Sequence, residues 1–166
     1  MLQIGSQVVY GIHGVCNIIG TELRNVDRKK VEYFILEPND QPGARFYVPS
    51  QNQAALSKLR TVLQREEMER LLDSDAAKED CWIAVENLRK QKYRELINNA
   101  DCAALISMMR VLHRHKEEQL SAGRKFHLCD ENFLRDAKKM LCSEISLVLE
   151  ISRPDAVAYI EKKICE

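Results

Sequence analysis

The side chains best suited to chemistry in this chain are four histidines and six cysteines, since imidazole and thiolate groups bind metals and act in catalysis. No Cys-x-x-Cys pair occurs, and the closest approaches to a ligand pair are His113-x-His115 and His127-x-Cys129. Side chains two positions apart on a helix point in different directions, so neither pair predicts a metal site. We expect no metal ion and no other cofactor.

An enzyme would need an acid, a base and a nucleophile held together by the fold. Glu144, the histidines and Cys129 could in principle supply them. However, the sequence contains no nucleophile–base motif and no glycine-rich phosphate loop. We therefore predict that the protein is not an enzyme and has no catalytic residues.

The elements that must position these side chains follow from where glycine and proline occur. Five of the six glycines and three of the four prolines lie within the first 49 residues. Such residues interrupt short strands, whereas their scarcity lets long helices continue. The fold class is predicted as α+β, with a small Tudor- or SH3-like β-barrel followed by an all-α part of about five helices. The predicted domains are residues 1–58 and 59–166.

Short apolar runs separated by turn residues predict the strands of the barrel. Gly20 is expected to mark a bulge or bend, and residues 25–30 and 38–43 are expected to form loops. The strands are expected at residues 7–10, 15–21, 31–36 and 44–48, with a fifth possible.

Helical periodicity starts at Thr61, and capping signals predict where later helices begin and end. Asp101 is expected to cap one helix, Gly123 to end it, and Ser152 to cap the last one. A helix beginning near Trp82 or Val85 is expected to end at Ile97, and another to begin at Asp130.

One carboxylate lies on the apolar side of its predicted helix. Glu144 falls near Ala137, Met140 and Val148, where an unpaired charge would be costly. Lys116 has a similar position in the apolar stripe of its own helix, so we expect these two residues to pair.

Charge and terminal sequence restrict the compartment and the partners. The amino terminus lacks the features of a signal peptide, and no apolar run could span a bilayer, so we expect a cytoplasmic protein with reduced cysteines. Residues 81–128 carry nine basic and five acidic side chains with three of the four histidines. This block is either a site for a polyanion or a solvated helix surface.

Four stretches of sequence, in order along the chain, resemble the CarD/CdnL family of bacterial transcription regulators. The first is Ile4-Gly5-x-x-Val8-Val9-Tyr10-x-x-His13-Gly14-Val15, and the others are Glu32-Tyr33-Phe34-Ile35-Leu36, Tyr47-Val48-Pro49 with Asn52, and Leu120-Ser121-Ala122-Gly123-Arg124-Lys125. The first module also occurs in the polymerase-binding part of transcription-repair coupling factor. The similarity covers nearly the whole chain.

The resemblance implies a Tudor-like domain that binds the β subunit of RNA polymerase and a helical domain that contacts promoter DNA. It also implies that the protein stabilises the open complex near the upstream edge of the bubble. We expect a monomer that acts in the cytoplasm at the nucleoid. The expected polymerase-binding residues are Arg24, Arg45, Phe46, Tyr47, Val48 and Pro49. A strand in this region could also offer its edge to a partner.

In the family a tryptophan inserts into the minor groove, and Trp82, the only tryptophan here, stands at the corresponding junction. An apolar wedge unstacks a base step while nearby cations hold the phosphates. Trp82 is either this wedge or a packed core residue. The expected DNA-binding residues are Trp82, Arg89, Lys90, Lys92, Arg94, Arg124 and Lys125. The alternative is a polymerase-binding adaptor whose helical domain binds protein rather than DNA.

Overall fold

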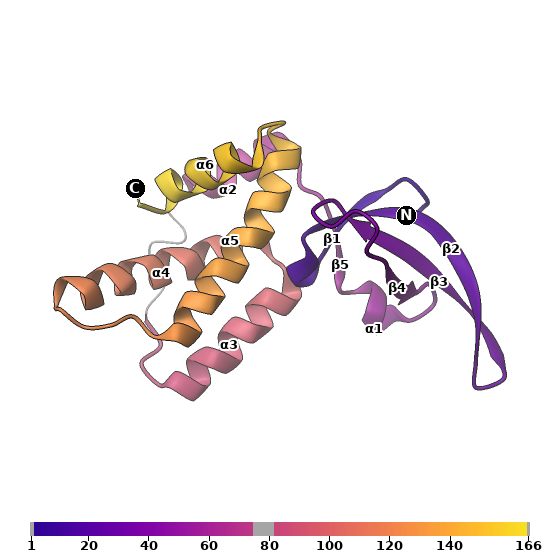
Figure 1. Cartoon of the computed structure of the whole chain (residues 1–166), viewed down its shortest axis with the longest axis horizontal. Coiled ribbons are helices and arrows are strands. Elements are labelled where there is room, and N and C mark those ends of the chain that lie inside the picture. The colour runs from indigo at the N-terminus through magenta and orange to yellow at the C-terminus, as the bar shows by residue number, and fades with distance from the viewer. Residues whose placement is uncertain (1, 75–81, 166) are drawn as a thin grey trace.

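The computed structural model describes residues 2–74 and 82–165 and has two parts, a sheet and a group of helices (Figure 1). The sheet contains five antiparallel strands in the order β4-β3-β2-β1-β5. Their bounds are Gln7–Tyr10 (β1), Val15–Val26 (β2), Lys29–Pro38 (β3), Phe46–Pro49 (β4) and Leu59–Thr61 (β5). The α+β class is confirmed. The sheet is not closed, in contrast to the predicted barrel, because the short edge strands β4 and β5 do not pair with each other.

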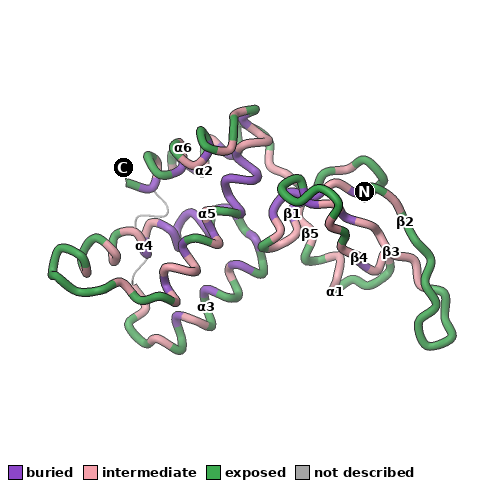
Figure 2. Tube along the Cα trace, in the orientation of Figure 1, coloured by how far each residue is buried: buried purple, intermediate pink, exposed green. Residues whose placement is uncertain are grey.

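The hairpin formed by β2 and β3 is longer than expected. Both strands continue to Asp27 and Arg28, whose φ angles of 50° and 64° form a two-residue turn. Two central residues with positive φ match the twist of a tight hairpin, so the loop predicted at residues 25–30 is wrong. The register shifts between Ile18 and Gly20, which confirms the expected bulge. Residues 21–30 are exposed throughout and form a projecting arm (Figure 2).

Within the described residues, the helical part contains five helices of nine or more residues, preceded by the short helix α1. Thr61 belongs to β5 and pairs with Val8, so the first long helix begins at Arg65 rather than at Thr61. The bounds are Gln53–Leu56 (α1), Arg65–Asp73 (α2), Glu86–Asn99 (α3), Cys102–Ser121 (α4), Leu128–Val148 (α5) and Arg153–Cys165 (α6), with a 3-10 turn, η1, at Gly11–His13. None of the helices in the described ranges is long and apolar enough to cross a membrane.

The predicted helix caps form as expected. The Asp101 carboxylate accepts a hydrogen bond of 2.8 Å from the Ala104 N–H, and the Ser152 hydroxyl accepts one of 3.2 Å from the Asp155 N–H. Between α3 and α4, Ala100 adopts a left-handed conformation with φ of 53°. This residue ends α3 and turns the chain directly into the Asp101 cap.

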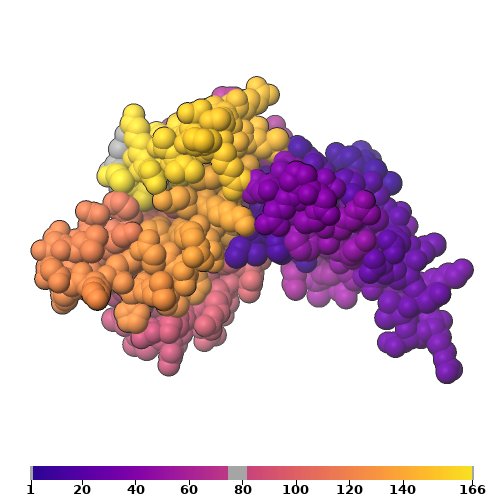
Figure 3. Space-filling view, in the orientation of Figure 1, coloured from indigo at the N-terminus to yellow at the C-terminus, as the bar shows by residue number. Residues whose placement is uncertain are grey.

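The strands of the sheet contribute side chains to two separate apolar cores. A small core lies within the sheet, and a larger core lies among the helices. Neighbouring strand residues face opposite sides, so Val8 packs in the small core whereas Val9 joins the helical one. Val15 of β2 also belongs to the helical core. The two parts therefore abut directly over β1 and the start of β2 (Figure 3).

Candidate functional site

The first candidate surface is one face of the sheet beside edge strand β4. Arg24 of β2 extends across this face, and its guanidinium carbon lies 3.6 Å from the centre of the Tyr47 ring. Glu22 accepts a hydrogen bond of 2.8 Å from Arg24 Nε. Among the described residues, no strand pairs with β4 on the side away from β3. Two of the residues selected from sequence, Arg24 and Tyr47, are thus in contact next to an open strand edge.

The remaining residues selected near β4 differ in accessibility. Arg45 is exposed and Pro49 is half-buried. Phe46 lies on the other face of the sheet, where its ring centre is 4.0 Å from that of His13. Val48 is buried in the small core, so its side chain is closed to a partner and only its main chain can take part.

The second candidate surface surrounds Trp82, just before α3. The indole is half-buried against the edge of the helical core. It stacks on the His115 ring of α4, with 3.5 Å between ring centres and an interplanar angle of 13°. The guanidinium carbon of Arg89 lies 4.3 Å from the centre of the indole ring. Trp82 is thus neither a free wedge nor a fully buried core residue.

Arg89 is buried, contrary to its expected role at a phosphate. Its Nε and Nη2 atoms donate to the two carboxylate oxygens of Asp130 at 2.9 and 3.0 Å. Only 4% of Arg89 is exposed, and a guanidinium with both edges committed has no donor for an incoming phosphate. This side chain is therefore structural and is not available to contact DNA.

The other expected cations do lie on the surface. Lys92 and Arg94 are exposed on α3, and Lys90 is half-buried and paired with Glu86 one turn earlier. Arg124 and Lys125 are exposed between α4 and α5. The pKa of Glu86 is lowered, first by its hydrogen bond with Lys90, and the charge of His127 contributes. The Arg89–Asp130 ion pair places the start of α3 beside the start of α5.

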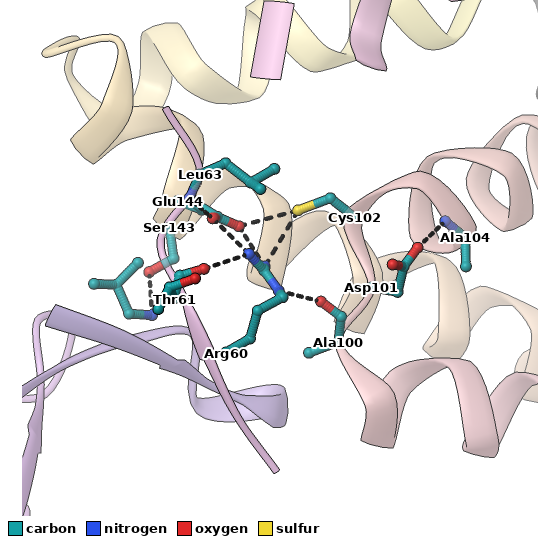
Figure 4. A network of polar contacts seen from close by, with 10 residues as sticks. Arg60, Thr61, Leu63, Ala100, Asp101, Cys102, Ala104, Ser143 and Glu144 are labelled. Carbon is teal, nitrogen blue, oxygen red and sulfur yellow. Dashed lines mark hydrogen bonds and ion pairs between the residues drawn. The ribbon is translucent and has the colours of Figure 1, made fainter. Parts of the chain in front are cut away.

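A polar network joins the sheet to the helices (Figure 4). Arg60 of β5 donates to both carboxylate oxygens of Glu144 on α5, at 2.8 and 2.6 Å, and to the Ala100 carbonyl at 2.8 Å. Glu144 also accepts hydrogen bonds from the Leu63 N–H at 2.9 Å and the Cys102 thiol at 3.1 Å. This network was not anticipated from the sequence.

Burial of Glu144 would by itself raise its pKa, but the hydrogen bonds and charge of Arg60 outweigh burial and lower it. Glu144 is therefore ionised and paired with Arg60. The expected Lys116–Glu144 pair is wrong, because Lys116 instead bonds to Glu131 at 3.0 Å. The sequence did show that Glu144 needed a partner, but the partner lies 84 positions away.

The sheet and the helices also meet where the main chain at Gly14 and Val15 packs closely against α5. The Val15 N–H donates to the Ser143 hydroxyl at 3.1 Å, across 128 positions of sequence. Gly14, with φ of 68°, lies so close to α5 that a Cβ atom there would be 2.7 Å from Ser143 Oγ. Only glycine combines this φ angle with this approach.

The histidines and cysteines do not assemble a metal centre in the part of the chain that the structure describes, which contains no group of three or more potential ligands. His113 and His115 diverge as expected: His113 Nε2 lies 3.4 Å from the Cys165 thiol, whereas His115 stacks on Trp82. Glu144, considered as a catalytic acid, is instead fully engaged by Arg60. Cys81 lies outside the described residues.

Comparison with known proteins gives a match to each part of the chain. The model of the CarD-like/TRCF RID domain matches residues 2–60, and that of the CarD C-terminal domain matches residues 67–161. No curated protein matches the chain. The two domain models occur in the same order as the sheet and the helices.

Proposed function

Because the chain belongs to the CarD family of transcription-related, RNA polymerase-interacting proteins, we propose that it binds the polymerase β subunit and stabilises the promoter open complex. The CarD domains are those of non-enzymatic regulators. In this proposal the N-terminal sheet binds the polymerase and the helical part contacts DNA near the upstream edge of the bubble. The protein would act as a cytoplasmic monomer at the nucleoid.

The observation that carries this proposal is that helix α3 extends from the Trp82 segment to the sheet. Helix α3 has the Trp82 segment at its start, and its last turn is followed by Ala100, whose carbonyl accepts a bond from Arg60. Fourteen helical residues extend about 21 Å. A partner bound at the sheet would therefore hold Trp82 at a fixed distance, as expected of a protein that links polymerase to one position on DNA.

The sheet supports polymerase binding through Tyr47, Arg24, Arg45, Pro49 and the free edge of β4. An added strand would gain main-chain hydrogen bonds, and the Arg24–Tyr47 pair would give specificity. Phe46 and Val48 would shape the strand from the core side rather than contact the partner through their side chains.

The helical part supports DNA contact through Trp82 and the surface cations. An inserted apolar group requires nearby positive charge to hold the distorted backbone, and α3 supplies Lys92 and Arg94. The full set of proposed phosphate contacts is Lys90, Lys92, Arg94, Arg124 and Lys125. Nothing in this set indicates base-specific readout, so contact would tolerate many promoter sequences.

The alternative, a helical part that binds protein, is favoured by exposed apolar side chains near the same end. Val85, Leu88 and Leu128 are 57%, 58% and 75% exposed, and they lie on or beside the first turns of α3 and α5. A protein partner would cover such side chains, whereas phosphates would not.

Two glutamate substitutions in the full-length chain, one on each surface, test the two surfaces against each other. Tyr47→Glu should abolish capture of polymerase, because it places a charge at the supposed contact, and should leave the fold intact by circular dichroism. Arg124→Glu should leave capture unchanged but weaken promoter binding by the ternary complex, reducing the log–log salt slope by about one. Each variant is the control for the other.

The same measurements reject the proposal in distinct ways. Unchanged capture by the Tyr47→Glu variant would remove β4 from the polymerase contact. A promoter mobility shift that is the same with wild-type and Arg124→Glu protein would favour the protein-binding alternative.

A further inference from the structure

The main chain that carries Trp82 is fixed by Arg89. Residues 82–84 lie outside any helix or strand, so their polar groups need other partners. Arg89 Nη1 donates to the Ile83 carbonyl at 2.9 Å and to the Ala84 carbonyl at 3.5 Å. Asp130 of α5 holds the other edge of the same guanidinium. The position of the Trp82 backbone therefore depends on a buried ion pair between α3 and α5.

The indole ring itself is held from a third helix. His115 of α4 is stacked almost parallel to it, at 3.5 Å between ring centres. A stacked aromatic pair stabilises one relative orientation beyond what burial alone provides. The ring of Trp82 is therefore confined by α4, while its backbone is confined by α3 and α5.

His115 is in turn held in place by its own neighbours. Its Nδ1 atom lies 3.7 Å from the Glu118 carboxylate one turn further along α4, and its side chain is 20% exposed. The Phe126 ring, in the segment between α4 and α5, lies 6.4 Å from the His115 ring. Because Trp82, Glu118 and Phe126 all lie beside it, the imidazole of His115 has little freedom to rotate away from the indole.

We infer that His115 is a positioning residue for Trp82: it keeps the indole in a single pose before DNA arrives. The inference rests on the proposed function, because the pose matters only if Trp82 contacts DNA. A side chain already ordered in the free protein loses less conformational entropy on binding. Part of the half-buried indole remains accessible to a base step. Because His115 stacks on the ring, it determines which part of the indole surface is accessible.

His115→Ala in the full-length chain tests the inference in the free protein. Trp82 is the only tryptophan, so quenching of fluorescence by acrylamide reports on this indole alone. The quenching constant should rise in His115→Ala and should remain at the wild-type value in His115→Phe, which retains a flat ring for stacking. His113→Ala is the matched control, since His113 lies on the same helix but contacts Cys165.

The second measurement is the lifetime of the open complex formed with polymerase and promoter DNA. His115→Ala should shorten it about 2- to 10-fold, the factor that corresponds to the loss of one aromatic pair. His115→Phe should restore it, and His113→Ala should not change it. A purely structural role would lower thermal stability without this selective rescue.

The inference is overturned if His115→Ala leaves the quenching constant unchanged. It is also overturned if Trp82→Ala shortens the lifetime while His115→Ala does not, and the proposed function then stands. If Trp82→Ala itself leaves the lifetime unchanged, the DNA role of Trp82 fails, and the quenching comparison still decides whether His115 holds the indole.

Discussion

Helix α5 buries one carboxylate near each end, and each carboxylate holds an arginine from a different part of the chain. Near its start, Asp130 binds Arg89 of α3, and about four turns further along Glu144 binds Arg60 of β5. Both arginines donate two hydrogen bonds to their carboxylate. The two ion pairs are chemically alike, but they connect α5 to different parts of the molecule.

The difference lies in what surrounds each pair. Arg60 and Glu144 join the sheet to the helices and gain further bonds from the Leu63 N–H and the Cys102 thiol. Arg89 and Asp130 join two helices and the segment that carries Trp82. The comparison indicates that one pair fixes how the two parts of the molecule meet, whereas the other shapes a local surface.

The largest expected effect comes from breaking the pair between sheet and helices. Glu144→Gln removes the charge that compensates Arg60, and loss of one partner from a buried pair costs about 3–5 kcal/mol of the free energy of unfolding. Urea denaturation followed by circular dichroism measures this change. Glu150→Gln, at an exposed position after α5, should change stability by less than about 0.5 kcal/mol. A loss below about 1 kcal/mol for Glu144→Gln would contradict the role given to the pair.

Breaking the other pair should cost less and act locally. Asp130 accepts two hydrogen bonds, both from Arg89, whereas Glu144 accepts four from three residues. We therefore expect Asp130→Asn to cost about 3 kcal/mol, the lower end of the range for buried pairs. The variant should also raise acrylamide quenching of Trp82, which Glu144→Gln should not. If both variants change Trp82 quenching equally, the two pairs do not have separate roles.

The close contact between Gly14 and α5 offers a third test. Gly14→Ala adds a Cβ atom 2.7 Å from Ser143 Oγ at a φ of 68°. Left-handed strain of about 1–2 kcal/mol and overpacking of about 1 kcal/mol should together lower stability by about 2–3 kcal/mol. Gly11→Ala is the control, because φ there is 48° but nothing lies within 4 Å of the added atom. Only the strain should appear in Gly11→Ala, and equal losses would show that packing against Ser143 is unimportant.

The pH dependence of stability should give the smallest and most specific effect. The pKa of Glu144 is lowered from its ordinary value of 4.5 by Arg60, so the folded state binds a proton less readily than the unfolded state. The contribution of Glu144 is therefore complete above about pH 4.5 and is lost as the pH falls through the folded pKa. Chemical denaturation at pH 3 to 6 should show a shallower slope for Glu144→Gln than for the wild type. Parallel slopes would mean that Glu144 is not the group responsible.

Features of this fold that depend on neighbouring residues could be predicted from the sequence. The Asp101 and Ser152 caps and the bulge at Gly20 were predicted correctly, because each depends on a few consecutive residues. The tight turn at Asp27 and Arg28 was missed, since Arg28 carries no signal for positive φ.

The candidate site was harder to predict because its contacts are distant in sequence. Glu144 was recognised as needing a partner, but Lys116 and Arg60 are both cations and only the tertiary fold chooses between them. Arg89 looked like one of several surface cations on α3, and its burial depends on Asp130 of another helix. The choice of polymerase-binding and DNA-binding residues remains a prediction.

The hydrogen bond between Val15 and Ser143 joins residues that are synthesised at very different times, and this affects how the protein folds during translation. Translation delivers the N-terminus first, and early segments begin to fold while later ones are still being synthesised. The β1–β2 hairpin can form early, but Val9 and Val15 face a core whose central helix is translated more than 100 residues later. One apolar side of the nascent sheet therefore stays exposed until α5 has been synthesised. Truncated chains that stop before α5 should be prone to aggregation.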